Sequence, residues 1–293
     1  MTGTWLRRLL RMARFRVAAG LVLVVTVLAV VPAAVVSLSP ADVAPTDCSV
    51  RAADGTYQDR LPPSSTHWFG TDAQGCEVFA QVVWGTRTSL YIGVGSGVLI
   101  AVLGTMLGLI AAISGGRVDA LIRRTCDVTL GIPLVVGAIL LLSLLAGEQR
   151  SPTEIMLVLT LLGWPGAARI ARGAARLVLV QSYIEAARAA GAGNVHVTMR
   201  HVLPNVLSSV VAYSSLTVGL LIAAESTLTY LGIGLQVPSV SWGLMIEGAQ
   251  RSYATSPHLI VFPSVMLVIT VTAFVLLGDA TRDAVDAHIQ VAR

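Results

Sequence analysis

The chain has 293 residues, of which 55% are hydrophobic and only 12% are charged, and its formal net charge is +4. Because soluble globular domains carry roughly 25% charged residues, this composition excludes a soluble domain and predicts a protein embedded in lipid. All 20 basic residues are arginines, so the chain has neither the lysine of a phosphate-binding loop nor a Schiff-base lysine. Any nucleotide that the protein uses must be bound by another chain.

Residues 5–16 alternate apolar and basic positions at helical spacing. The pattern predicts a basic amphipathic segment over 1–16 on the cytoplasmic side, either as a short helix in the headgroup plane or as a flank that orients the first span. Residues 17–41 carry no charge and predict a first transmembrane helix over 17–38. This run is too long for the core of a cleaved signal peptide.

Five further apolar segments follow, and with the first they predict an all-α polytopic membrane protein of six transmembrane helices. The expected spans are 17–38, 88–112, 128–147, 154–170, 206–230 and 258–278. The fourth is short, since only 14 uncharged residues separate Glu154 from Arg169. With it, fifteen arginines lie on one side of the membrane and five on the other. Positive charge is retained in the cytoplasm, so both termini are predicted to be cytoplasmic.

These spans divide the rest of the chain into an extracytoplasmic loop, a five-helix core and a cytoplasmic tail. Their expected bounds are 39–86, 87–280 and 281–293. A second external segment, 231–257, overlaps an uncharged stretch that is long enough to test as a seventh span. Its proline, serines and glycines favour a loop or a partial re-entry instead.

The second predicted span carries a stripe of small residues. Spacings of three or four place them on one face of a helix: Gly93, Gly97, Ala101, Gly104 and Gly108. Such a stripe allows another helix to approach closely, so we interpret it as a packing surface.

The segment 185–205, EAARAAGAGNVHVTMRHVLPN, is polar and basic although apolar segments flank it. Residues 185–190 favour a helix, Gly191 begins a break, and Asn194 is placed to cap a second short helix. That helix is expected to run up to Pro204, where the fifth span begins. The result is a helix–turn–helix joined rigidly to two spans, which serves either as a docking site for a partner or as a plain ordered loop.

This segment resembles the EAA loop of ABC importer permeases. The matching positions are Glu185, Ala186, Ala187, Gly191, His201, Leu203 and Pro204. The family pattern has an isoleucine where His201 stands, and the string from Arg200 to Asn205 is instead similar to the branch that imports dipeptides, oligopeptides and nickel. Further matches to that branch, spread over 65–290, are Phe69 to Asp72 with Gly75, Gly163 to Gly166 with Ala168, Arg169 and Arg172, Leu231 to Gly234, Ser241 to Gly243, Leu277 to Asp279, and Arg282 with Asp283.

The chain is thus similar to the second, C-type permease subunit of a dipeptide/oligopeptide transporter. The resemblance implies a type I importer permease (MetI-like) fold in the bacterial plasma (inner) membrane, forming half of a translocation pathway. It implies a second homologous permease, one or two ABC ATPase subunits that bind ATP and Mg, and an extracytoplasmic substrate-binding protein as partners. No nucleic acid, enzymatic activity, cofactor or metal is expected of this chain itself. Nickel, glutathione and haem are alternative cargoes.

The resemblance further implies that the loop 169–204 couples the permease to the ATPase. The coupling residues carried over from the family pattern are Glu185, Ala186, Ala187, Gly191, Arg200, His201, Leu203 and Pro204. Glu185 is expected to position the loop through hydrogen bonds or through a basic residue of the partner, and Gly191 to provide the turn.

One departure from the family pattern concerns the extracytoplasmic loop. Where the family usually has a glycine, an arginine and an acid, this chain has Gly75, Cys76 and Glu77. The lost arginine leaves the local ion pairing open. It also places Cys76 in the same compartment as Cys48, so the two are either joined in a disulfide or remain free thiols.

Glu225 lies near the outer end of the fifth predicted span. A carboxylate there is costly unless it faces other helices or a watery path. It is interpreted either as a pore residue that meets a peptide amino terminus or a metal cation, or as a hydrogen-bonded packing group. The family often has an acid at this position, which does not separate the two interpretations.

Two other classes of protein are alternatives to an ABC importer permease. A secondary transporter or channel accommodates six spans and one buried acid but does not explain the arginine-rich two-helix loop. An intramembrane serine protease is disfavoured, because Val94 stands two positions before Ser96 where such enzymes have glycine, and no histidine lies clearly within a span. His196 and His201 are five residues apart, which is wrong for one helix face, so no metal site is predicted.

Overall fold

The computed structural model describes residues 12–41, 44–46, 48, 59–145 and 150–291, with side chains up to residue 284 in the last helix. These residues are almost entirely helical, and the one β-type pairing among them is a single bridge between Thr71 and Glu77. Most of the basic segment predicted over 1–16 lies outside the described residues. The helices are α2 (Ala13–Val30), α3 (Pro32–Val36), α4 (Val78–Ser114), α5 (Gly116–Leu130), α6 (Leu134–Leu144), α7 (Pro152–Leu179), α8 (Ser182–Ala189), α9 (Asn194–Val197), the π-helical turn η1 (Thr198–Val202), α10 (Leu203–Tyr230), α11 (Trp242–Ala249) and α12 (His258–Val291).

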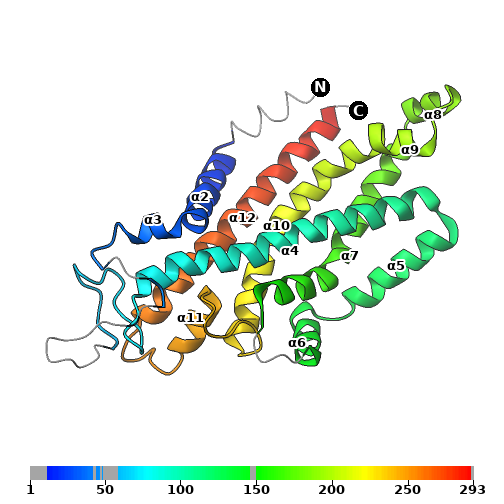
Figure 1. Ribbon diagram of the computed structural model, residues 1–293. Coiled ribbons are helices and arrows are strands. Elements are labelled where there is room, and N and C mark those ends of the chain that lie inside the picture. The colour runs from blue at the N-terminus through cyan, green and yellow to red at the C-terminus, as the bar shows by residue number, and fades with distance from the viewer. Residues whose placement is uncertain (1–11, 42–43, 47, 49–58, 146–149, 292–293) are drawn as a thin grey trace.

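Five of these helices are long and apolar enough to cross a membrane: α2, α4, α7, α10 with its preceding turns, and α12. In Figure 1, α10 and α12 run side by side, and the first turn of α2 and the last turn of α12 lie at the same end of the molecule as α8 and α9. We call this the EAA end, and the opposite end, where α11 lies, the α11 end. The all-helical fold agrees with the prediction, whereas the cytoplasmic position of this end remains a prediction.

The third predicted span, 128–147, is not a continuous helix. It consists of the last turn of α5 and the whole of α6, and the axes of these two helices meet at 90°. Gly131 and Pro133 separate them; the proline cannot continue a helix from α5, because it lacks a backbone donor and disfavours a helical residue before it. The described residues therefore provide six spans only if α5 and α6 are taken together as one broken span.

Helix α4 begins ten residues earlier than the predicted span and extends over 37 residues, or about 55 Å. Its first three turns were expected to belong to the loop 39–86, and their apolar side chains instead pack on α11 and the start of α12. Val78 and Val82 share this cluster with Ala249 and Leu259. The hydrophobic packing at the α11 end thus extends the helix beyond the uncharged stretch from which its length was predicted.

The small-residue stripe of α4 packs against two helices. A side chain at Gly93 or Gly97 would collide with Ile222 or Val218 of α10, whereas one at Gly104 would lie 2.8 Å from the backbone nitrogen of Ala168 in α7. The stripe therefore lets α4 cross α7 and α10 at very short range, as its spacing predicted.

We expect Gly108→Val to destabilise the protein by about 1–3 kcal/mol, because overpacking strains a close contact. The β-carbon would lie 2.6 Å from the carbonyl oxygen of Ala168 and 2.9 Å from the backbone nitrogen of Arg172. The matched control is Gly173→Ala, where the β-carbon meets nothing within 4 Å. Thermal unfolding of both variants in detergent checks this; an unchanged melting temperature for Gly108→Val would contradict the α4–α7 contact.

Candidate functional site

Helix α8 ends in a turn that only a few residue types adopt comfortably. Gly191 has a φ of +88°; its amide donates to the carbonyl of Arg188, and the amide of Ala192 donates to the carbonyl of Ala187, each at 3.0 Å. This pair of bonds forms a Schellman motif, in which glycine is favoured because it has no β-carbon. No atom lies within 4 Å of a β-carbon built at Gly191, so backbone conformation, and not lack of space, favours glycine here.

The second half of the loop differs from the prediction in two ways. Gly193 precedes the first turn of α9 as its cap, and Asn194 is already helical. The chain also does not break at Pro204, since α9, η1 and α10 form one continuous helix from Asn194 to Tyr230. Proline removes one helical hydrogen bond, and the wider π-type turn just before it accommodates that loss. The second arm of the loop is therefore a direct extension of the membrane helix.

Buried apolar side chains fasten this loop to the membrane helices. Ile184 of α8, Val197 of α9 and Val202 of η1 have at most 1% of their surface exposed. They share one cluster with Leu109 of α4 and Ala175 of α7. The loop therefore packs as part of the helical core and is more than a solvated connector.

The opposite face of the loop is exposed and mixes apolar and charged groups. Val195 and Met199 are 76% and 63% exposed, and Arg200 and Glu185 are also exposed. In the described part of the chain, Glu185 makes no ion pair or side-chain hydrogen bond. A firmly held element with such a face is suited to bind a partner protein.

The remaining residues of the predicted coupling set lie on the same loop. Ala186, Gly191 and Pro204 are exposed, whereas Ala187 and Leu203 are partly covered. His201 lies between the two arms, with its ring 6.0 Å from that of Tyr183 in α8. The sequence-predicted residues thus lie on one loop that is partly exposed, and their role in coupling remains a prediction.

Glu225 is fully buried where α4, α10 and α11 meet. Its carboxylate accepts hydrogen bonds from four hydroxyl groups. These are Thr229 at 3.0 Å, Ser241 at 3.1 Å, and Ser89 and Ser226 at 3.3 Å. Such a cage satisfies a buried acid, and it supports the packing interpretation over the pore interpretation, because no surface of Glu225 is open to a cargo.

Next to Glu225, the short helix α11 packs on α4, α10 and α12. Ser241 caps α11 by accepting a bond from the amide of Leu244. Trp242 is completely buried and donates its indole N–H to the carbonyl of Val82 in α4 at 3.0 Å. The segment 231–257 therefore forms a loop with one short helix, as its composition favoured.

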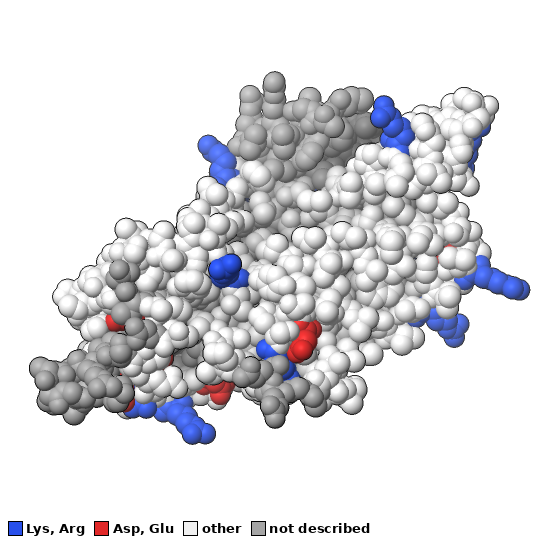
Figure 2. Space-filling model, in the orientation of Figure 1, with Lys and Arg blue, Asp and Glu red and all other residues white. Residues whose placement is uncertain are grey.

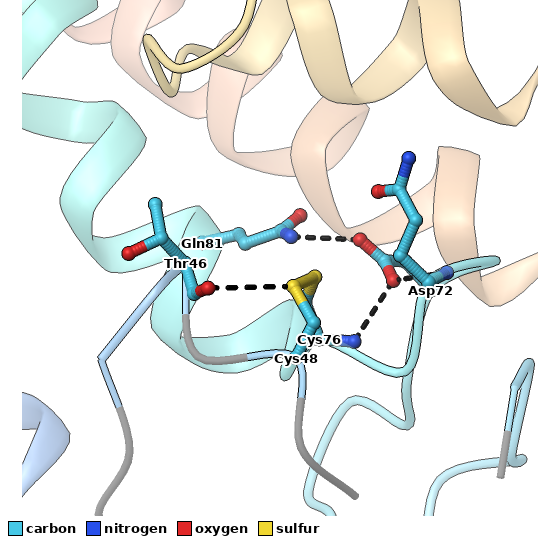
Figure 3. The surroundings of a disulfide bond; sticks show 6 residues. Thr46, Cys48, Asp72, Cys76 and Gln81 are labelled. Carbon is cyan, nitrogen blue, oxygen red and sulfur yellow. Dashed lines mark hydrogen bonds between the residues drawn. A yellow bond between two sulfur atoms is a disulfide. The ribbon is translucent and has the colours of Figure 1, made fainter. Parts of the chain in front are cut away.

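The resemblance string from Phe69 to Asp72 with Gly75 forms a tight turn at the same end. The Asp72 carboxylate accepts bonds from the amides of Gln74 and Cys76 and from the side chain of Gln81. Gly70 has a φ of +77°, and a β-carbon there would meet the carbonyl of Leu61 at 2.2 Å. These contacts, of which Figure 3 shows those of Asp72, explain locally why an aspartate and a glycine stand at these two positions.

A disulfide joins Cys48 to Cys76 beside this turn (Figure 3). Cys76 is buried, and Glu77, which follows it, pairs with the side chain of His67. At the position where the family has an arginine, the chain thus has a covalent link, and the neighbouring acid has a histidine as its partner.

A charge cluster that sequence reasoning missed lies at the EAA end. Asp119 of α5 is 5% exposed and binds Arg172 of α7 through both oxygens, with the second contact at 2.8 Å. Arg176 donates to the same carboxylate at 2.9 Å, and Arg123 lies 3.5 Å from it. The signal was present as arginines three and four residues apart in α7, but their partner lies more than fifty residues away in the sequence.

Apolar helices of membrane-spanning length, a close-packed stripe of small residues and an anchored, protruding loop define a polytopic helical membrane protein. The model for "binding-protein-dependent transport system inner membrane component" matches residues 104–291, and the chain belongs to this family.

Two relatives cover most of the chain. The glutathione transport system permease protein GsiD of Pectobacterium atrosepticum is 36% identical over 234 residues, which cover 79% of this chain and 77% of that protein. The dipeptide transport system permease protein DppC of Bacillus subtilis is 35% identical over 234 residues, which cover 80% and 72%. A solved inward-facing structure of the MetNI methionine ABC transporter has a TM-score of 0.54 at 22% identity and covers 70% of this chain and 96% of that one, which shows the fold.

For Glu225 we expect two substitutions to differ. Glu225→Leu removes the acceptor of four buried hydroxyl groups and is expected to cost about 1–3 kcal/mol of stability, seen as a lower melting temperature. Glu225→Gln keeps an acceptor of the same shape and is expected to leave the preference among cargoes unchanged in competition uptake. A changed preference at an unchanged protein level would assign Glu225 to the pore.

Counting the free thiols tests whether Cys48 and Cys76 form a disulfide. The chain has three cysteines, and only Cys126 is free and buried. Alkylation of the denatured, unreduced protein is expected to modify one cysteine by mass spectrometry, and three after reduction. Modification of all three without reductant would show that Cys48 and Cys76 are thiols.

Proposed function

We propose that this chain is one of two transmembrane subunits of an ATP-driven importer and that the EAA loop transmits the motion of a separate ATPase to the membrane helices. The observation that carries the proposal is the construction of the loop. One face is anchored in the helical core through Ile184, Val197 and Val202, and the other face is exposed and has apolar and charged groups for a partner.

The distribution of arginines supports placing the EAA end in the cytoplasm. Figure 2 shows few, widely separated charged side chains along the long helices, with arginines projecting from the end where α8 and α9 lie. Since positive charge is retained in the cytoplasm, this orientation puts both termini inside and the disulfide outside, where oxidised cysteines persist.

Coupling follows from the mechanical continuity of the two arms. Helix α8 is joined through a short connection to the end of α7, and α9 runs on into α10 without a break. A displacement of the loop by a partner therefore moves two membrane helices together. Glu185, exposed and without a partner in the described chain, is then available to a basic residue of the ATPase, which binds ATP and Mg in place of this chain.

We further propose that the cargo is a short peptide, delivered by an extracytoplasmic binding protein. The support is the identity with permeases named for dipeptide and glutathione transport; glutathione is itself a tripeptide, so one class of cargo covers both names. A second homologous permease completes the pathway, and one or two ATPase subunits drive it. A secondary transporter would work without ATP, and proton-driven uptake by this chain alone would favour that class.

We expect Glu185→Lys and Gly191→Asp to reduce ATP-dependent uptake to background while the protein still inserts. The first reverses the charge offered to the ATPase, and the second places a side chain at a φ that disfavours one. Uptake into proteoliposomes of the assembled transporter measures both. The matched control is Gly173→Ala, which changes an α7 glycine in open space; normal coupling in both test variants would contradict the assignment.

Val195→Cys tests the sidedness of the loop directly. Its side chain is 76% exposed, and in this orientation it is expected to react with a membrane-impermeant maleimide only after the cells are opened. It is also expected to crosslink to the ATPase subunit. Labelling from outside intact cells would reverse the orientation.

A further inference from the structure

The Asp119 cluster, defined by Asp119, Arg123, Arg172 and Arg176, joins the broken span to the helix that leads into the EAA loop. Arg172 is 20% exposed and grips the Asp119 carboxylate with two parallel bonds. Arg176, one turn further along α7, donates to the same carboxylate. Helix α7 ends at Leu179 and α8 begins at Ser182, so the cluster lies directly next to the point where the loop leaves the membrane helices.

The two halves of the broken span are attached to α7 at different places. At the EAA end α5 is held by the Asp119 cluster, whereas α6 packs through Ala138 and Leu142 in the apolar cluster that contains Ile155 and Leu159, near the start of α7. Between the two attachments lies the 90° bend. Any rigid displacement of α7 is therefore delivered to the broken span at two separate points.

Net stability does not explain why the attachment at the EAA end is ionic. A buried ion pair contributes little more than apolar residues of similar size, because desolvation offsets its attraction. Apolar contacts are also already present, since Ile122 and Cys126 of α5 pack with Trp164 and Ala168 of α7. An arginine–carboxylate pair with two hydrogen bonds instead fixes how α5 and α7 are aligned, because the planar guanidinium group binds both oxygens in only one orientation.

We propose that Asp119 is a positioning residue for transport: it fixes α5 to α7 so that a displacement of the EAA loop moves the broken span together with α7. This inference rests on the proposed function of the loop and extends it by naming where the motion passes to a third membrane element. Asp119 touches neither cargo nor nucleotide in this scheme, and it acts through Arg172 and Arg176.

The test compares Asp119→Asn with Asp119→Glu in the complete transporter, reconstituted in proteoliposomes with its binding protein. Cargo uptake and ATP hydrolysis are measured together, with glutathione and a pool of dipeptides as the two cargoes. Asp119→Asn is expected to assemble and hydrolyse ATP but to lower the uptake per ATP about tenfold, within the usual range of coupling between sites. Asp119→Glu, which keeps the charge, is expected to restore most of that ratio, whereas a purely structural role would lower assembly and leave the ratio unchanged.

The matched control is Asp127→Asn. Asp127 pairs with Arg169 between the same two helices, but both side chains are more than half exposed, so this pair contributes little and uptake per ATP is expected to stay normal. If Asp119→Asn does not assemble, Arg176→Gln is measured in its place. Arg176 is half exposed, and its loss leaves the Arg172–Asp119 pair intact, so this variant is expected to assemble. A lowered uptake per ATP in Arg176→Gln supports the proposal.

The outcomes separate the two proposals. If the wild-type transporter shows no ATP-dependent uptake of either cargo, the proposed function is overturned, and the inference with it. If the wild type transports and Asp119→Asn, or Arg176→Gln in its place, keeps the normal ratio of uptake to ATP, the inference alone is overturned.

Discussion

The crossing of α4 and α7 is the constraint on which the rest of the structure depends. Gly104 and Gly108 have no side chains, and the backbone of α7 occupies the space where their β-carbons would lie. Lipid tails are as apolar as the side chains of the helices, so the hydrophobic effect does not drive helices together within a membrane. Close van der Waals contact of this kind holds them together instead. The same stretch of α7 that lies on these glycines carries Arg172, so the crossing also sets where the Asp119 carboxylate must meet it.

From this crossing the loop obtains its rigidity. The buried loop residues Ile184, Val197 and Val202 pack against Ala175 of α7 and Leu109 of α4. The loop is therefore held by the same two helices that cross at Gly104 and Gly108. In the proposed function this packing allows the loop to transmit force, whereas a connector held only by its two ends would bend. The Schellman turn at Gly191 adds to this, because its two backbone bonds close the angle between the arms without help from side chains.

The sequence predicted what depends on local pattern and missed what depends on distant partners. The order of the helices follows from apolar length, and the glycine stripe and the turn at Gly191 follow from spacing and backbone preference. The sidedness inferred from arginine placement remains a prediction. The bend after α5 was missed although Pro133 marks it, because an uncharged stretch alone does not distinguish a straight span from a broken one. Continuity through Pro204 was missed because a π-type turn overrides the usual effect of proline. Asp119 was missed because only the folded chain places α5 against α7.

The two ends of the molecule use different chemistry to hold a buried acid. Glu225 is surrounded by hydroxyl groups of α4, α10 and α11, which are neutral donors. Asp119 is held by guanidinium groups whose forked geometry allows little freedom. The acid near the α11 end is thus held by neutral hydrogen bonds, and the acid at the EAA end by charged bonds of fixed geometry. Under the proposed function, the charged attachment keeps α5 and α7 in register when a partner moves the EAA loop.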